Sequence, residues 1–341
     1  MSEHIDYKKS GVDTKRTDAL VHWLQSSSIK KDSSASLSDI GGFASLYKPD
    51  LSKYEDPVIV SSTDGVGTKI LLALEHNVLD NIGHDLVGMC VNDLYTIGAD
   101  PLFFLDYFAS GKIEPSQFKT ILNSIKNALN LCEIPLLGGE TAELPGLYSK
   151  HHFDLAGFVV GMVSKNRIIQ KNFIKDKDVL LAIPSSGFHS NGYSLIRKWL
   201  EKKNIDASLL KNLLAPTNIY REIPQLCRNF FPHIHGIAHI TGGGIPGNLS
   251  RVMPCNTMAH IDFSSLKTPI WMRQFIEYHT DKMENVGGVF NLGVGMILCV
   301  TNNIKNDIHD YLQEFNVPTY EIGQISTSPS SSPIVQILWE S

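Results

Sequence analysis

The sequence predicts an α/β protein of two domains, each built on its own sheet. Strand-like and helix-like patterns alternate along the chain, and glycine-rich segments follow several of the strands. The length of 341 residues is sufficient for two domains with separate cores. A polar stretch over residues 164–178 carries five Lys/Arg residues and divides the chain, so we expect domains at residues 1–168 and 169–341.

In the first half, short apolar runs predict strands at residues 57–62, 102–108 and 155–163. A helix is expected over residues 86–97, because its apolar residues share one stripe and Gly98 can close it. Pro115 suits the first turn of a second helix, which continues to Cys132 with another apolar stripe.

The pattern restarts in the second half. A strand over residues 179–183 leads into a loop of small and polar residues, and a helix follows over residues 193–200. Residues 239–244 precede a short helix, and a strand over residues 290–300 closes the second core.

Composition excludes several classes of protein. Apolar residues make up 43% of the chain and charged residues 19%, as in a folded globular protein. The net charge is −5, so no basic excess favours nucleic acid or a membrane surface. Apolar runs such as residues 101–109 are far shorter than the roughly 20 residues of a bilayer span, and the N-terminus lacks an apolar secretion signal. We expect a cytoplasmic protein without nucleic-acid or membrane partners.

The cysteines and histidines do not form metal-binding patterns. The five cysteines stand singly, and the 13 histidines lack the spacing of zinc ligands. We therefore expect reduced, mostly packed thiols and no structural zinc.

The first segment with chemical character is Thr63-Asp64-Gly65-Val66-Gly67-Thr68-Lys69. Its glycines allow a tight turn that brings backbone N–H groups close to phosphate oxygens. Lys69 adds positive charge, and Asp64 can hold Mg²⁺. The spacing from glycine to lysine is too short for a Walker loop, and a plain turn is the alternative.

Two further aspartates lie in apolar surroundings. Asp93 falls at the edge of the apolar stripe of its helix, with Asn92 on the opposite side. Asp106 falls in an apolar strand, where an unpaired charge would be costly. A divalent metal would satisfy both carboxylates, and so would a salt bridge to a buried Lys or Arg.

The third segment is Gly138-Gly139-Glu140-Thr141-Ala142-Glu143. We expect the glycines to end a strand, and Glu140 and Glu143 to face the same side if the chain then turns helical. A cation between these like charges would remove their repulsion. With the three aspartates, they supply the oxygen donors that Mg²⁺ prefers. A solvated acidic loop is the alternative for Glu143.

Two segments of the second half place small residues and flexible backbone between a strand and a helix start, which suits an anionic ligand. They are residues 185–192, with His189, Ser190 and Asn191, and residues 239–244, with His239, Thr241, Gly242 and Gly243. Both histidines can move protons near neutral pH, and a structural role is the alternative for each. Asn191 and Thr241 can also cap helices.

These segments together resemble the phosphoribosylformylglycinamidine cyclo-ligase family, also called AIR synthetases, of purine biosynthesis. Eight stretches match the family in order across nearly the whole chain: residues 63–69, 85–93, 101–108, 138–146, 154–158, 185–195, 239–244 and 290–296. The resemblance implies a two-domain AIR synthetase-like fold with mixed α/β sheets and a larger C-terminal domain on the substrate side. It also implies a homodimer formed through the sheets of the N-terminal domains.

The activity implied by the resemblance is ATP-dependent ring closure of formylglycinamidine ribonucleotide to aminoimidazole ribonucleotide, with release of ADP and phosphate. Mg²⁺ is then expected at Asp64, Asp93, Asp106 and Glu140. The nucleotide is expected at Asp64, Gly65, Val66, Gly67, Thr68, Lys69, Gly138, Gly139, Glu140 and Thr141. The substrate is expected at His189, Ser190, Asn191, Thr241, Gly242 and Gly243, with His189, His239 and Lys69 as catalytic candidates. The sequence does not determine whether K⁺ is also required.

Three departures from the family pattern bear on nucleotide contact, on the rate or on substrate affinity, and one of them is the run at residues 14–18. Residues 30–37 stand where the family has an arginine-rich stretch, and residues 284–290 lack an expected arginine. A thiamine-monophosphate kinase-like phosphotransferase is the alternative enzyme, since it shares the acidic residues. A catalytically silent nucleotide-binding subunit is the alternative of a different class.

Overall fold

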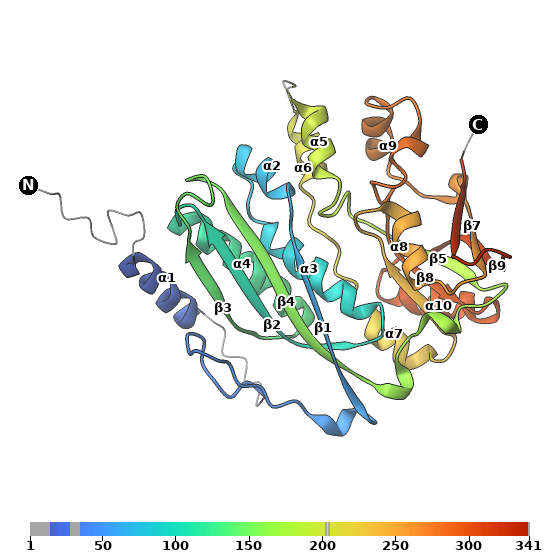
Figure 1. The fold of residues 1–341 in the computed structure, drawn as a ribbon, viewed down its shortest axis with the longest axis horizontal. Coiled ribbons are helices and arrows are strands. Elements are labelled where there is room, and N and C mark those ends of the chain that lie inside the picture. The colour runs from blue at the N-terminus through green and yellow to red at the C-terminus, as the bar shows by residue number, and fades with distance from the viewer. Residues whose placement is uncertain (1–13, 28–34, 202, 204, 340–341) are drawn as a thin grey trace, which may run out of the picture.

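The computed structural model describes residues 14–27, 35–201, 203 and 205–339, and it contains two sheets side by side. The first sheet uses strands between residues 57 and 164, and the second uses strands between residues 179 and 338 (Figure 1). Part of the altered stretch at residues 30–37 lies outside the described residues.

The first sheet has four strands in the order β1-β4-β2-β3. They are β1 (Pro57–Gly65), β2 (Asp100–Ser110), β3 (Leu136–Glu143) and β4 (Phe153–Ser164). β4 is antiparallel to both β1 and β2, whereas β3 is parallel to β2, so the sheet is mixed. Helices α3 (Ile82–Tyr95) and α4 (Pro115–Cys132) pack against each other, and α3 lies on β1, β2 and β4.

The two faces of this sheet differ in their covering. On the helical face, Phe108 stacks on Phe153 at 5.4 Å and meets Phe118 of α4 edge-on at 5.2 Å. On the other face, Ile59 and Phe158 are 71% and 41% exposed. Apolar side chains alternate with the strand period, so the sheet has one buried face and one that the described chain covers only in part, where Tyr47 packs on Phe103 at 5.1 Å.

The second sheet has six strands in the order β10-β7-β9-β5-β8-β6. They are β5 (Val179–Pro184), β6 (Ile234–His239), β7 (Thr257–Asp262), β8 (Val294–Val300), β9 (Tyr320–Thr327) and β10 (Ile334–Leu338). The helices of this domain are α5 (Tyr193–Leu200), α6 (Ala207–Leu213), α7 (Ile223–Phe230), α8 (Gly244–Val252), α9 (Ile270–Glu277) and α10 (Lys305–Glu314). Every residue of β6 and β8 is buried; β8 is apolar throughout, whereas β6 carries the buried His235 and His239.

Two elements have the predicted bounds, and others are shifted or longer; the helix predicted over residues 86–97, for example, is α3 at Ile82–Tyr95. The predicted bounds are confirmed for α4 and α5. The strand predicted from residue 290 begins only at Val294. The helical turn considered for residues 140–143 is wrong, because these residues continue β3. Glu140 and Glu143 therefore face opposite sides, and Glu140 is exposed whereas Glu143 is buried.

No helix in the described part of the chain combines the length and the apolar character that crossing a bilayer requires.

Candidate active site

Helix α3 forms the seam between the two domains. Its Asp85 and Asn92 bind residues 215–220 of the second domain, a segment that we call the strap. Thr217 donates to Asp85 Oδ1 from its backbone N at 2.8 Å and from Oγ1 at 2.7 Å. Asn92 Oδ1 accepts from Tyr220 N at 3.0 Å. Asp85 and Asn92 are fully buried, so the strap satisfies polar groups that would otherwise be stranded inside the protein.

Lys69 belongs to this seam. Its buried Nζ lies 2.9 and 2.8 Å from the two carboxylate oxygens of Asp85, and it donates to the carbonyl oxygens of His189 at 2.8 Å and Ala215 at 2.7 Å. An ammonium group has three donors, and these partners use all of them. The predicted contact between Lys69 and a triphosphate does not agree with this arrangement, because no donor remains for a phosphate oxygen.

The rest of the glycine-rich segment forms the end of β1 and the turn into α2 (Lys69–Glu75). Gly67 is exposed and has a φ of +69°, a conformation that glycine adopts without strain. Asp64 Oδ1 accepts from Gly65 N at 2.7 Å, and Thr68 Oγ1 lies 3.1 Å from Ser194 Oγ of α5. The turn therefore lies beside the second domain, and its backbone at Gly67 is accessible.

A cavity of about 350 Å³ between the domains contains the pair Asp93 and His239. His239 Nδ1 lies 2.9 Å from Asp93 Oδ1, and Ser62 Oγ donates to Asp93 Oδ2 at 3.4 Å. The imidazole is buried, whereas the Asp93 side chain is 40% exposed. Asp93 therefore orients the ring and still presents carboxylate surface to the cavity. Burial raises the pKa of the nearby Asp64, and the negative charge of Asp93 raises it further.

The other two predicted metal ligands lie apart from this pair. Strand register places Asp64, Asp106 and Gly139 in one row, with Asp106 two strands from Asp64 on the same face. The Asp106 side chain is directed toward β3, because a Cβ added to Gly139 would collide with Asp106 Oδ1, and β3 lies on the side of β2 away from Asp64. Burial raises the pKa of Asp106 to about 7. Glu140 follows Gly139 and lies on the opposite, exposed face.

The predicted cluster of four carboxylates is therefore not formed. Within the described ranges, no three His, Cys, Asp or Glu side chains lie close enough together to hold a metal ion. Asp64 and Asp93 are the pair that the fold brings together. The predicted nucleotide-binding residues Gly138, Gly139, Glu140 and Thr141 are on β3, three strands from the turn after β1.

His189 is a buried anchor of the loop over residues 185–192. Its Nε2 accepts from the backbone N of Ser186 at 3.3 Å and of Asn218 at 3.4 Å. Burial holds the pKa of His189 well below its usual range, and the neighbouring His239 adds to this effect. A fully buried, neutral imidazole whose Nε2 is occupied is poorly placed to take a proton from a substrate, so His239 is the better of the two candidates.

The loops over residues 185–192 and 241–244 meet at Asn191 and Gly242. A Cβ added to Gly242 would lie 3.3 Å from Asn191 Oδ1, and no described group binds the buried Asn191 Nδ2. An unsatisfied buried amide is costly unless a ligand or water completes it. Asn248 holds the second loop, since its Nδ2 donates to the carbonyl oxygens of Thr241 at 3.2 Å and Gly244 at 2.8 Å. The structure thus brings together the predicted substrate loops.

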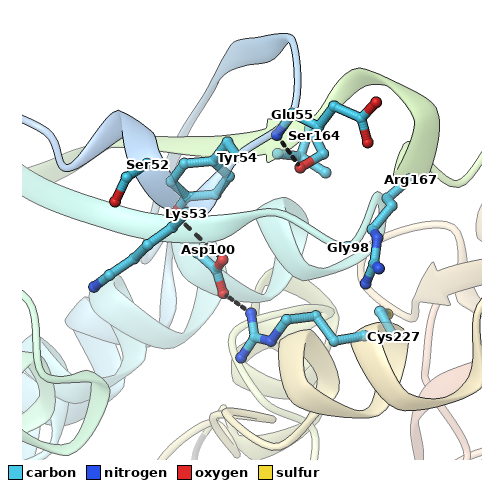
Figure 2. A pocket seen from close by; sticks show the side chains of 11 residues that line it. Ser52, Lys53, Tyr54, Glu55, Gly98, Asp100, Ser164, Arg167 and Cys227 are labelled. Atoms are coloured by element: carbon cyan, nitrogen blue, oxygen red, sulfur yellow. Dashed lines mark hydrogen bonds and ion pairs between the residues drawn. The ribbon is translucent and has the colours of Figure 1, made fainter.

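A larger cavity of about 540 Å³ contains none of the predicted site residues. Arg228 of α7 forms an ion pair with Asp100 of β2. Figure 2 shows Tyr54 beside Asp100, and Tyr54 donates to the other oxygen of this carboxylate at 3.3 Å. Glu55 N donates to Ser164 Oγ at 3.0 Å. The contact of Arg228 with Asp100 crosses the domain boundary, and the other two lie within the first domain. We place the chemistry in the smaller cavity, because it holds an exposed carboxylate beside a histidine.

Four residues important to this site were not predicted from the sequence. They are Asp85, Thr217, Asn248 and Arg251, the last of which lines the smaller cavity. Asp85 lies in an apolar helix just as Asp93 does, so its burial could have been inferred from the pattern. The others lie in segments without chemical character, and only the fold shows their positions.

Comparison with known proteins places the chain among relatives of known name. A model of the N-terminal domain of AIR synthase related proteins matches residues 47–163, and one of the C-terminal domain matches residues 175–336. A phosphoribosylformylglycinamidine cyclo-ligase of Coxiella burnetii is 42% identical over 98% of this chain and 96% of its own length. The protein of the same name from Thermodesulfovibrio yellowstonii is 42% identical over 94% of this chain and 96% of its own.

Solved structures of the same fold are more distant in sequence. Thiamine-monophosphate kinase from Stenotrophomonas maltophilia has a TM-score of 0.65 at 17% identity, over 94% of this chain and 95% of that one. The hydrogenase maturation protein HypE of E. coli has a TM-score of 0.64 at 14% identity, over 95% of this chain and 93% of that one. At such identities, the likeness concerns the fold alone.

Proposed function

Because the chain belongs to the AIR synthase related protein family, we propose that it converts formylglycinamidine ribonucleotide to aminoimidazole ribonucleotide, with ATP hydrolysed to ADP and phosphate. The observation that carries this proposal is 42% identity, over nearly the whole chain, to relatives named phosphoribosylformylglycinamidine cyclo-ligase. Residues 1–168 would carry the nucleotide and residues 169–341 the substrate side of the cleft.

The chemical difficulty is that an amide carbonyl is a poor electrophile and its oxygen a poor leaving group. Transfer of the γ-phosphoryl group to the formyl oxygen gives an imidate phosphate and ADP. The amidine nitrogen of the substrate then attacks the activated carbon, phosphate leaves, and loss of a proton completes the five-membered ring. The protein contributes position and charge neutralisation.

The nucleotide would lie at the turn over residues 64–68, with Asp64 and Asp93 as the carboxylates for Mg²⁺. Their proximity supports this assignment, since two like charges are relieved by a cation between them. Bound Mg²⁺ would neutralise charge on the phosphate oxygens. Asp106 and Glu140 stay outside the proposed pair because of their positions on the sheet.

The substrate would lie between the loops that meet at Asn191 and Gly242, with Ser190, Thr241 and Gly243 around it. The unpartnered Asn191 Nδ2 supports a ligand at this point. We assign the final proton to His239, because Asp93 holds its Nδ1 and leaves Nε2 with one long contact, 3.5 Å to Asn92.

The open face of the first sheet supports a homodimer. Ile59 and Phe158 lie on strands that pair directly, and an apolar sheet face of this kind is normally covered. A second copy of the chain would cover it through an isologous contact.

The decisive assay incubates the purified protein with ATP, Mg²⁺ and formylglycinamidine ribonucleotide and measures aminoimidazole product. Product formation at the rate of ADP release supports the cyclo-ligase. Phosphorylation of thiamine monophosphate would instead support the kinase alternative, whose fold is shared. ATP binding without turnover of either compound would support a silent subunit.

A further inference from the structure

The smaller cavity contains a positive charge that no motif indicated. Arg251, in the last turn of α8, lines the cavity together with Asp93, His239 and Asn248. Of the described residues around this cavity, Arg251 alone has a permanent positive charge.

The guanidinium is oriented but its charge is not neutralised. Arg251 Nη1 donates to Asn248 Oδ1 at 3.4 Å, and within the described chain Arg251 forms no ion pair. Asn248 also holds Thr241 and Gly244, so the arginine is tethered to the same residue that shapes the glycine-rich loop. An arginine at the end of a helix also interacts favourably with the helix dipole, but that effect does not require a position in a cavity.

The walls of the cavity carry opposite charges from different domains. Asp93 comes from α3 of the first domain and Arg251 from α8 of the second, and the two do not form a salt bridge. A cation on the carboxylate and a phosphoryl group on the guanidinium would give alternating charges across this space. Arginine suits the second position, since its planar donors bind phosphate oxygens in pairs.

We propose that Arg251 binds a phosphoryl group in this cavity. The inference rests on the proposed function for its biological meaning, because both ATP and formylglycinamidine ribonucleotide carry phosphate. The shared chemistry is a phosphate ester or anhydride next to Arg251. The tripolyphosphate and the ribose 5-phosphate arms of the test distinguish the two sources.

The test uses Arg251→Met and Arg251→Lys, with Arg273→Met as the matched control. Arg273 lies on α9 and pairs with Glu277 four residues away, and it does not line this cavity. Calorimetric titration with inorganic tripolyphosphate plus Mg²⁺, and separately with ribose 5-phosphate, measures binding without turnover. We expect Arg251→Met to weaken one of the two probes about 10-fold or more, as for loss of a hydrogen bond between charged groups. Arg251→Lys should recover part of the loss, and the control should bind as wild type.

A loss of affinity for tripolyphosphate assigns Arg251 to the nucleotide, and a loss of affinity for ribose 5-phosphate assigns it to the substrate. Unchanged binding of both probes by Arg251→Met would overturn the inference. In the enzyme assay, Arg251→Met should raise the KM of the same compound, ATP or formylglycinamidine ribonucleotide, whose phosphate probe binds more weakly. A wild-type protein that forms no aminoimidazole product refutes the proposed function instead, and the binding result then stands separately.

Discussion

The buried ion pair at the domain seam allows the sharpest prediction about stability. Replacing Lys69 with Met keeps most of the side-chain volume but removes the ammonium group. Asp85 would then be left as a buried carboxylate whose remaining partners are the two donors of Thr217. Breaking a buried pair by removing one partner costs roughly 3–5 kcal/mol. This loss is a large fraction of the 5–15 kcal/mol that stabilises a typical domain.

The measurement is urea unfolding followed by circular dichroism and tryptophan fluorescence. Lys165→Met provides the control, since Lys165 and Asp56 form a pair at 3.0 Å in which both side chains are more than 60% exposed. That variant should lose at most about 1 kcal/mol. Adding Asp85→Asn to Lys69→Met should recover part of the stability, because the stranded charge is then removed. If Lys69→Met unfolds at the same urea concentration as Lys165→Met, with the same slope, the assignment of Lys69 to the seam is refuted.

Three other predictions concern the first sheet and the cavity. The pKa of Asp106 is about 7 in the folded protein and near 4 in the unfolded chain. The folded state therefore holds this proton more tightly, and the free energy of unfolding falls as the pH rises from about 4 through 7. The Tm of Asp106→Asn minus the Tm of wild type should therefore be larger at pH 8 than at pH 5. The same Tm difference at both pH values would contradict the burial argument. Phe158→Lys should convert a dimer to a monomer, measured as the mass in sedimentation equilibrium. Leu131→Lys, which changes another exposed apolar residue, should leave the dimer intact. Equal masses for the two variants would exclude the sheet face as the interface. Asp93→Asn should lower kcat at least ~10-fold and raise the Mg²⁺ concentration needed for half-maximal rate. Its Tm should change little, because the Asp93 carboxylate is partly exposed. A normal Mg²⁺ dependence would remove Asp93 from the proposed pair.

The fold was largely predictable because periodicity records burial. The stripe over residues 115–132 predicts α4 with its observed bounds, and the apolar run at residues 179–183 predicts the core of β5. Both depend on local spacing and on contact with a core that every α/β domain has. The prediction for residues 140–143 was wrong because glycines usually end strands, whereas here Gly139 allows β3 to lie against Asp106 of β2.

The site was less predictable, because the partner of a charged residue is decided by tertiary structure. The same composition that suggests a phosphate loop at residues 64–69 is compatible with Lys69 turning inward to Asp85. The separation of Asp106 from Asp64 depends on strand order, which no spacing in the sequence specifies. Arg251 and Asn248 follow a recognisable glycine-rich loop, but only the fold brings them to the cavity that Asp93 also lines.

The strap also determines how this protein can be recombined with its relatives. A chimaera joined near residue 170 would inherit residues 215–220 from one parent and Lys69, Asp85 and Asn92 from the other. Backbone atoms of the strap make many of these contacts. The parent that supplies the strap must therefore have the same main-chain path there, and its side-chain identities matter less. Crossover points that keep α3 and the strap from the same parent should therefore give soluble hybrids more often than crossovers at the domain boundary itself.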